Sequence, residues 1–146
     1  MAKALTHQQI LALPLQQQAL AWEDQRNRAR LHEIKQMASA LAMLQPMQSA
    51  IQAAGHTLYA GSLSPAHGKR NTLCISVFTT SSEIALMKAL LTVGFVIIDR
   101  DDTSRTTLRT VVFKTGRLNL RVFTSVEHLT RAEQEYEASR QLKEAA

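Results

Sequence analysis

Six cationic side chains fall close together in the second half of this 146-residue chain. They lie within residues 100–121 and are Arg100, Arg105, Arg109, Lys114, Arg117 and Arg121. Guanidinium and ammonium groups bind phosphate oxygens, and a two-stranded ribbon that carries them can enter a groove or follow a phosphate backbone. The grouping therefore indicates a surface for an anionic partner, and nucleic acid is the first candidate.

The same stretch has the pattern of a β-hairpin. Residues 105–124 predict two strands joined at Thr115-Gly116, where glycine supplies the positive φ that a tight turn needs. Symmetric pairing about that turn would set Lys114 opposite Arg117. Like charges side by side cost stability, and an anionic partner would relieve their repulsion. The alternative is an edge hairpin whose charges only protect it from aggregation.

Two more cations, Lys69 and Arg70, are adjacent in a loop that we expect over residues 64–71. They would join the hairpin surface if this loop lies on the same edge of the sheet. The predicted nucleic-acid-binding or anion-binding residues are then Arg105, Arg109, Lys114, Arg117, Arg121, Lys69 and Arg70. Aromatic platforms for single strands would strengthen this prediction; only Phe113 and Phe123 are available, and both fit a buried core equally well.

No other combination of side chains points to chemistry. The aspartates of residues 99–102 lack the later glycine and glutamate of a calcium-binding loop, and neighbouring arginines can neutralise them. The five histidines do not share a metal-ligand spacing, and no serine, cysteine or lysine has a neighbouring base. The sequence therefore predicts no metal site, no cofactor and no enzymatic activity.

The predicted secondary structure divides the chain into two parts, and the second part carries the cations. Residues 1–55 are predicted to be helical, because residues 15–44 contain no glycine or proline and are rich in strong helix formers. Pro46 ends or kinks this long helix, and Gly55 is placed to cap a short helix after it. Residues 56–146 are predicted to form a separate domain.

Strand-like runs separated by turn residues dominate this second part. The runs cover residues 57–63, 72–79, 95–98, 105–114 and 117–124. Two helices, over residues 81–93 and 126–143, follow Thr-x-x-Glu capping boxes that begin at Thr80 and Thr124.

The predicted fold class is α+β. N-terminal helices are followed by a mostly antiparallel sheet of about five strands, in the order β-β-α-β-β-β-α, with both helices on one face. Residues 95–98 are apolar at every position, so we expect a central strand that is buried on both faces. Residues 73–79 and 118–124 share a pattern that duplication and chance explain equally well.

Composition limits the compartment and the partners that we expect for this protein. The net charge of +5 resides in residues 56–124, because a small basic excess in residues 1–55 is cancelled by the acidic residues 125–146. The single cysteine, Cys74, excludes an intramolecular disulfide and fits a reducing compartment. No apolar run is long enough to span a bilayer, and no signal-peptide core is evident. We therefore expect a cytoplasmic protein without a membrane partner.

Two functions follow from these observations. The first is a small, non-enzymatic, basic protein that binds DNA or RNA through the hairpin of residues 105–121. The alternative is a protein-protein interaction module or inhibitor, of the kind that phage or plasmid accessory factors provide, which docks on an acidic surface of a larger host complex. In either case the arginine-rich N-terminal helices would suit a homodimer.

Overall fold

The computed structural model describes residues 4–100 and 108–145, with the backbone alone at residues 108 and 109. The chain divides into two compact units, Met1–Gln36 and Met37–Ala146. The boundary falls within the long helix α2 (Leu15–Leu44). The expected division at residue 55 stays a prediction, although the end of α2 belongs to the second unit.

The first unit contains the short helix α1 (His7–Leu11) and the first part of α2. The Gln9 amide donates to Thr6 Oγ1 at 3.2 Å, and the Thr6 amide donates to Gln9 Oε1 at 2.9 Å. This is the complete capping box that stabilises a helix start.

Contacts between α1 and α2 cover part of the polar half of the long helix. Ile10 is fully buried, and the rings of His7 and Trp22 lie with their centroids 5.2 Å apart. The Gln25 side-chain amide donates to the Leu5 carbonyl oxygen at 2.8 Å. These contacts hold α1 against the first part of α2, which is mostly polar.

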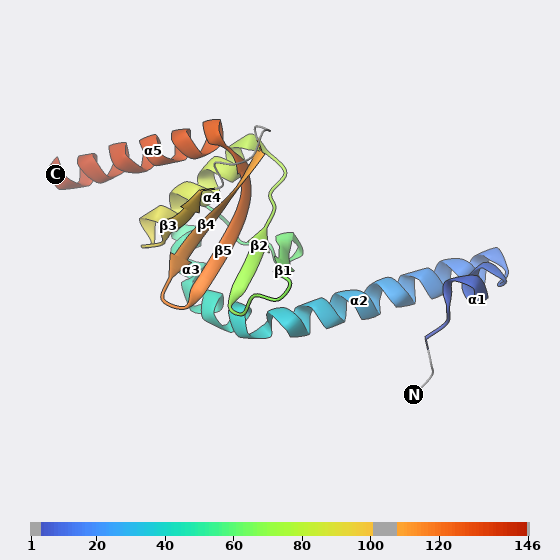
Figure 1. The fold of residues 1–146 in the computed structure, drawn as a ribbon. Helices are drawn as coiled ribbons and strands as arrows, with labels where there is room; N and C mark the ends of the chain where they lie inside the picture. The colour runs from blue at the N-terminus through green and yellow to red at the C-terminus, as the bar shows by residue number, and fades with distance from the viewer. Residues whose placement is uncertain (1–3, 101–107, 146) are drawn as a thin grey trace. The chain divides into compact units, whose positions relative to one another are not determined.

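The second unit is built on a five-stranded sheet with the spatial order β1-β2-β5-β4-β3 (Figure 1). The strands are β1 (Leu63–Pro65), β2 (Thr72–Ile75), β3 (Val96–Arg100), β4 (Leu108–Thr115) and β5 (Leu118–Ser125). β2 and β5 pair in parallel, and the other three pairings are antiparallel. The expected α+β class and mostly antiparallel sheet are therefore confirmed.

Helices α4 (Thr80–Thr92) and α5 (Val126–Ala145) cover one face of the sheet (Figure 1). The end of α2, a 3₁₀ turn (Gln45–Met47) and α3 (Gln48–Ala53) add to the same core. Side chains from all these elements form one cluster, and its helical members include Met37, Leu44, Ile51, Met87, Leu90 and Leu129. On the other face, which we call the open face, side chains of β4 and β5 are exposed or half-buried among the described residues, whereas β2 is buried at every position.

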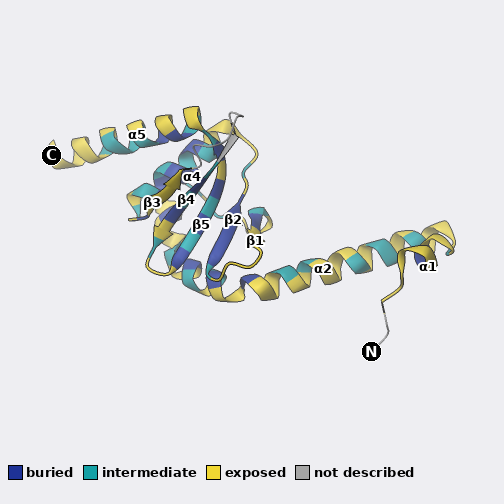
Figure 2. Cartoon of the chain, in the orientation of Figure 1, coloured by how far each residue is buried: buried dark blue, intermediate teal, exposed yellow. Residues whose placement is uncertain are grey.

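Strand alternation decides which side chains reach the core. On β5, Leu118, Leu120 and Val122 are buried, while the residues between them point to the open face. Phe113 of β4 pairs with Leu120 and is also fully buried. Figure 2 shows the resulting change between buried and exposed positions along the strands.

The prediction of a central, doubly buried strand at residues 95–98 is wrong. β3 is an edge strand, in which Val96 and Ile98 are 59% and 53% exposed. Only Phe95 and Ile97 pack with the core, and a bulge between Ile97 and Asp99 interrupts the pairing with β4. An apolar run shows that a segment favours a strand, but it does not determine which strands become its neighbours.

Local boundaries also differ from the expected ones. Instead of a strand over residues 57–63, the chain makes a 3₁₀ turn at Ala60–Ser62, and β1 starts only at Leu63.

The N-terminal caps of α4 and α5 lie one residue away from the expected positions. Thr79 Oγ1 accepts from the Ser82 amide at 3.1 Å.

At the start of α5, Ser125 Oγ accepts from the His128 amide at 3.2 Å, so Ser125 and not Thr124 caps this helix. Thr124 instead continues β5 and is fully buried. Each of two neighbouring hydroxyl residues could cap the helix. The cap is the residue that still has an extended backbone directly before the first helical turn.

The hairpin pairs in a different register from the symmetric one. Its two-residue loop is Gly116-Arg117, with Gly116 at φ 56°, and Thr115 pairs with Leu118. Lys114 therefore lies opposite Asn119, and the expected repulsion between Lys114 and Arg117 across the strands does not occur. The reason is the turn: a Gly116-Arg117 loop places glycine at the first loop position, where the positive φ is needed, and Phe113 stays on the core face in either register.

A bidentate ion pair ties α5 to the edge strand β3. The Arg100 guanidinium donates to the two carboxylate oxygens of Glu133 at 2.7 and 2.8 Å. These hydrogen bonds hold the pKa of the Glu133 carboxyl below its ordinary value, although partial burial acts in the opposite direction. Both side chains are partly exposed, so solvent screening limits the contribution to about 1 kcal/mol or less.

The lowered pKa of Glu133 predicts a pH dependence of stability. The pair stabilises the folded chain above the pKa of the unfolded carboxyl, about 4.3, and this contribution is lost as the pH falls through the lower folded pKa. Glu133→Gln should therefore reduce the stability at pH 7 and lose less stability than the parent between pH 5 and pH 3, measured by urea unfolding.

Arg100→Gln breaks the same pair and should show the same weaker pH dependence. If both variants lose stability in parallel with the parent at every pH, the pair does not contribute.

Candidate anion-binding surface

The parallel pairing of β2 and β5 brings two distant basic segments to one end of the sheet. Parallel strands start at the same end, and the Asn119 amide donates to the Asn71 carbonyl oxygen at 2.9 Å just before β2 begins. The loop that carries Lys69 and Arg70 therefore leads into β2 at the end where the Gly116-Arg117 turn leads into β5.

The loop before β2 has a defined conformation. The Lys69 amide donates to the Ala66 carbonyl at 3.1 Å, and Asn71 adopts a left-handed φ of 56°. Asn71 Oδ1 also accepts from Ser39 Oγ of α2 at 3.1 Å. The side chains of Lys69 and Arg70 are exposed on this anchored loop.

Lys114 and Arg121 project from the open face of the sheet beside this end. Lys114 pairs with Asn119, and Arg121 pairs with Val112, so the two cations occupy diagonal positions on β4 and β5. Diagonal neighbours across an antiparallel pair are separated by roughly 7–8 Å between α carbons. Such a separation lets both cations contact one extended polyanion.

We call these cations the basic end of the sheet. Its five members are Lys69, Arg70, Lys114, Arg117 and Arg121. None of them has an ion pair or a side-chain hydrogen bond with another residue of the part of the chain described above. Four are exposed and Arg121 is half-buried.

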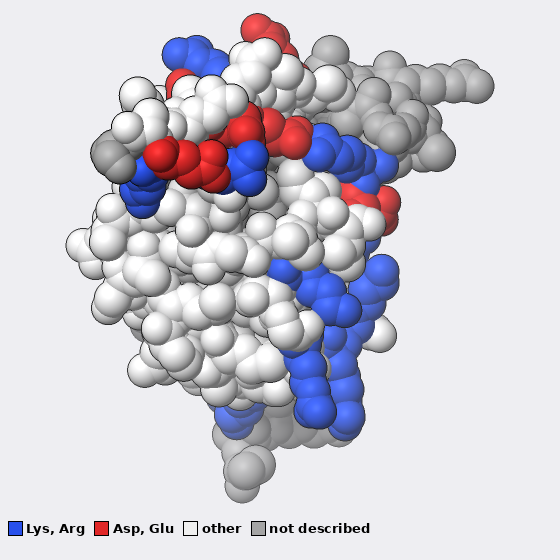
Figure 3. Space-filling model, turned by 90° about the vertical axis from the view of Figure 1, so that its left-hand side faces the viewer, with Lys and Arg blue, Asp and Glu red and all other residues white. Residues whose placement is uncertain are grey.

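The cations of α5 have a different environment. Arg140 lies 2.7 Å from Glu137, and Arg131 lies 3.4 Å from Glu135. Figure 3 shows several Lys and Arg side chains gathered at the lower right of the view, and Asp and Glu side chains mixed with cations above them. Arg131 and Arg140 are therefore paired with carboxylates, unlike the cations of the basic end.

Two of the predicted site residues are not placed in this group. Arg105 lies outside the described residues. The backbone of Arg109 pairs with Thr124, near the end of the hairpin away from the Gly116-Arg117 turn. The structure therefore brings five of the seven predicted residues together.

One open-face residue was not distinguished from core by sequence reasoning. Phe113 and Phe123 looked equivalent, but Phe113 is fully buried and Phe123 is 47% exposed on the open face. Alternation along the strand distinguishes them in the sequence. Phe123 stands two residues after Arg121 on the same strand, so an exposed Arg121 predicts an exposed Phe123.

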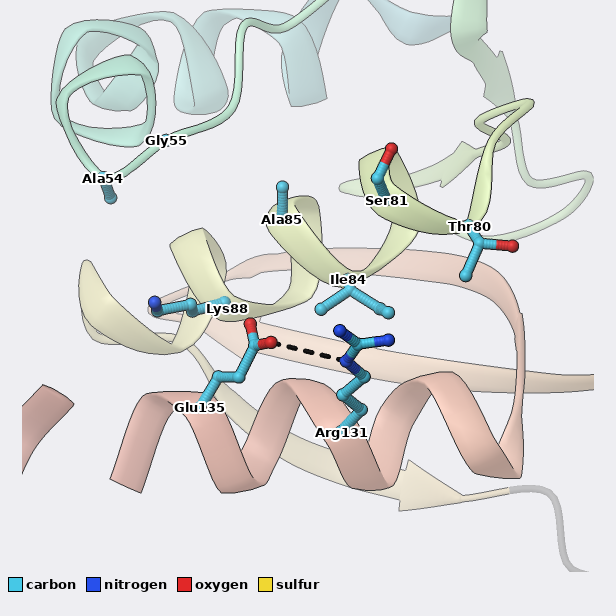
Figure 4. Close-up of a pocket in the computed structure, with 9 residues that line it drawn as sticks. All are labelled: Ala54, Gly55, Thr80, Ser81, Ile84, Ala85, Lys88, Arg131 and Glu135. Atoms are coloured by element: carbon cyan, nitrogen blue, oxygen red, sulfur yellow. Dashed lines mark ion pairs between the residues drawn. The ribbon is translucent and has the colours of Figure 1, made fainter. Parts of the chain in front are cut away.

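A groove in the helical layer is the other hollow of interest (Figure 4). It encloses about 590 Å³ between the end of α3, the outer face of α4 and α5. In Figure 4, Arg131 and Glu135 of α5 point toward α4 and pair with each other at 3.4 Å. This pairing leaves Lys88 as the one lining cation without an ion pair to a described residue, so the groove is a weaker anion site than the basic end.

The remaining titratable groups form no recognisable catalytic arrangement in the described part of the chain. His128 Nδ1 lies 3.4 Å from Glu83 Oε2, where the first turns of α4 and α5 meet, but no hydrogen bond joins them. Among residues 4–100 and 108–145, no cluster of three or more histidine, cysteine, aspartate or glutamate side chains could hold a metal ion.

Within the same residues, no helix combines the length and the apolar character needed to cross a membrane. Comparisons of the chain with protein-family models, with curated proteins and with solved structures find no match.

Proposed function

We propose that this chain is a non-enzymatic protein that binds nucleic acid through the basic end of its sheet. The observation that carries the proposal is the convergence of five cations from the β1–β2 loop, β4, the β4–β5 turn and β5. Like charges gathered without acidic partners destabilise a fold slightly, and phosphate groups would relieve this repulsion.

The geometry suits a backbone-tracking mode of binding. Lys69 and Arg70 lie on an exposed loop, Arg117 lies at a turn, and Lys114 and Arg121 lie on the adjoining open face. Cations at a loop, a turn and a sheet face form a continuous track for successive phosphates. Contacts of this kind position a nucleic acid without selecting its sequence.

The test is a binding titration by fluorescence anisotropy with labelled DNA and RNA at 50 mM salt. Replacing Lys114, Arg117 and Arg121 together by glutamine should weaken binding roughly tenfold or more, because three phosphate contacts are lost.

The matched control replaces Arg131, Arg140 and Lys143 of α5 by glutamine. It removes the same net charge from the acidic helix and should leave the affinity nearly unchanged. Equal losses in the two variants would mean that net charge, and not the basic end, drives binding. Absence of binding by the parent at 50 mM salt would overturn the proposal.

A second function is favoured by the edge strand β3. Val96 and Ile98 are more than half exposed on a strand whose outer side has no partner in the described part of the chain. Unprotected apolar edges are sites where another protein can add a strand. A protein-interaction role is therefore the alternative, and failure to bind nucleic acid at low salt would favour it.

A further inference from the structure

We infer that the open face of the sheet binds single-stranded nucleic acid in preference to duplex, with Phe123 as a base-stacking platform. This inference rests on the proposed function and names its substrate class. It is carried by the order of side chains that β5 presents on the open face, from the basic end toward Phe123.

Alternation along β5 sets three side chains in a row on the open face. Asn119, Arg121 and Phe123 alternate with the buried Leu120 and Val122, so they lie on the open face. Successive members of this row are separated by about 7 Å, twice the rise of an extended residue. An amide, a guanidinium and an aromatic ring therefore form a line that starts beside the basic end.

The ring of Phe123 is accessible to a ligand. Phe123 pairs on one side with Thr110, a small polar residue. On the other side β2 has already ended at Ile75, which pairs with Val122, so no strand residue flanks the ring there. No aromatic ring of the described residues stacks on Phe123, and the side chain remains 47% exposed.

A single strand is the partner that fits this row of side chains. An exposed phenylalanine on a flat sheet face binds the π-face of a base, and adjacent cations bind the phosphates that link successive bases. In a duplex the π-faces are covered by neighbouring base pairs, so the ring would gain no contact. Charge complementarity at Lys114 and Arg121 fits an anionic strand, whereas an acidic peptide would leave the stacking surface unused.

The row is long enough for a short segment of strand. From Asn119 to Phe123 it covers about 14 Å, and open sheets with exposed aromatic residues typically stack two or three bases. Stacking of this kind does not read the sequence, so a broad tolerance of base composition is expected.

The experiment compares one labelled 12-nucleotide strand, alone and annealed to its complement, in anisotropy titrations of the full chain at 50 mM salt. The parent should bind the single strand roughly tenfold tighter than the duplex. Phe123→Leu should lose about tenfold for the single strand and nothing for the duplex, because leucine keeps the bulk but has no π-face. Phe123→Tyr should retain the parent affinity.

A second readout reports stacking directly. A strand that contains 2-aminopurine should lose fluorescence on binding to the parent, since stacked 2-aminopurine is quenched, and this quenching should be reduced in Phe123→Leu. The control is Phe78→Leu. Phe78 is 91% exposed but lies between β2 and α4, outside the row, so its replacement should change neither readout.

The outcomes separate the two proposals. Binding to duplex as tight as to the single strand, or equal affinity of Phe123→Leu and the parent for the single strand, would overturn this inference and leave the proposed function standing. Failure to bind either form at 50 mM salt would overturn the proposed function itself.

Discussion

Raising the monovalent salt concentration from 50 to 200 mM should weaken binding of a single-stranded oligonucleotide by about 100-fold. Each phosphate contact with a single strand contributes about 0.7 to the slope of log affinity against log salt. The basic end has five cations, Lys69, Arg70, Lys114, Arg117 and Arg121, so the expected slope is about −3.5. A fourfold rise in salt then produces the stated loss.

The measurement is a series of anisotropy titrations at four or five salt concentrations. The variant with glutamine at positions 114, 117 and 121 retains two of the five cations, and its slope should be shallower by about 2. A parent slope close to −1 would mean that only one or two cations reach the strand. In that case the five cations of the basic end do not act together as a binding surface for the strand.

Phe113→Ala should cost about 3–5 kcal/mol of the free energy of unfolding. Phe113 is fully buried on the helix-covered face, opposite Leu120 of β5 and Ile97 of β3. Removing the ring leaves a cavity between the edge strand and the centre of the sheet. A loss of this size is a large part of the stability of a typical domain.

Urea unfolding followed by circular dichroism measures this cost, and the hairpin supplies its own control. Phe123→Ala removes the same atoms from the open face, where nearly half of the side chain is already exposed. Its expected cost is about 1 kcal/mol, as is common for partly exposed positions. Similar costs at the two positions would contradict the assignment of the faces.

The two phenylalanines also separate folding from binding. Phe113 should affect the affinity for nucleic acid only through the fraction of folded protein, because it lies on the covered face. Phe123 should affect the affinity for single strands with little effect on folding.

Sequence alone determined the features that depend on neighbouring residues. The capping box joins Thr6 and Gln9, which are three residues apart, and α2 covers residues 15–44 because nothing in that stretch interrupts a helix. Gly94 ends α4 with a φ of 107°, which glycine adopts without strain. These outcomes depend on side chains within a few residues of each other, and local patterns describe such interactions well.

Tertiary structure alone decided which strands are neighbours. The apolar run of residues 95–98 looked like a central strand, yet β5 takes the central position and β3 the edge. Strand order depends on how the whole set of apolar faces is buried at once. No window along the chain contains that information.

The same limit applies to the candidate site. The cations of the hairpin were visible in the sequence, but the parallel pairing of β2 with β5 is what brings Lys69 and Arg70 to the Arg117 turn. The hairpin register then set Lys114 against Asn119, and the open face exposed Phe123 while Phe113 became core. Composition and spacing therefore determined that this chain carries a basic surface. Long-range strand pairing, driven by burial of one face of the sheet, decided which residues form it.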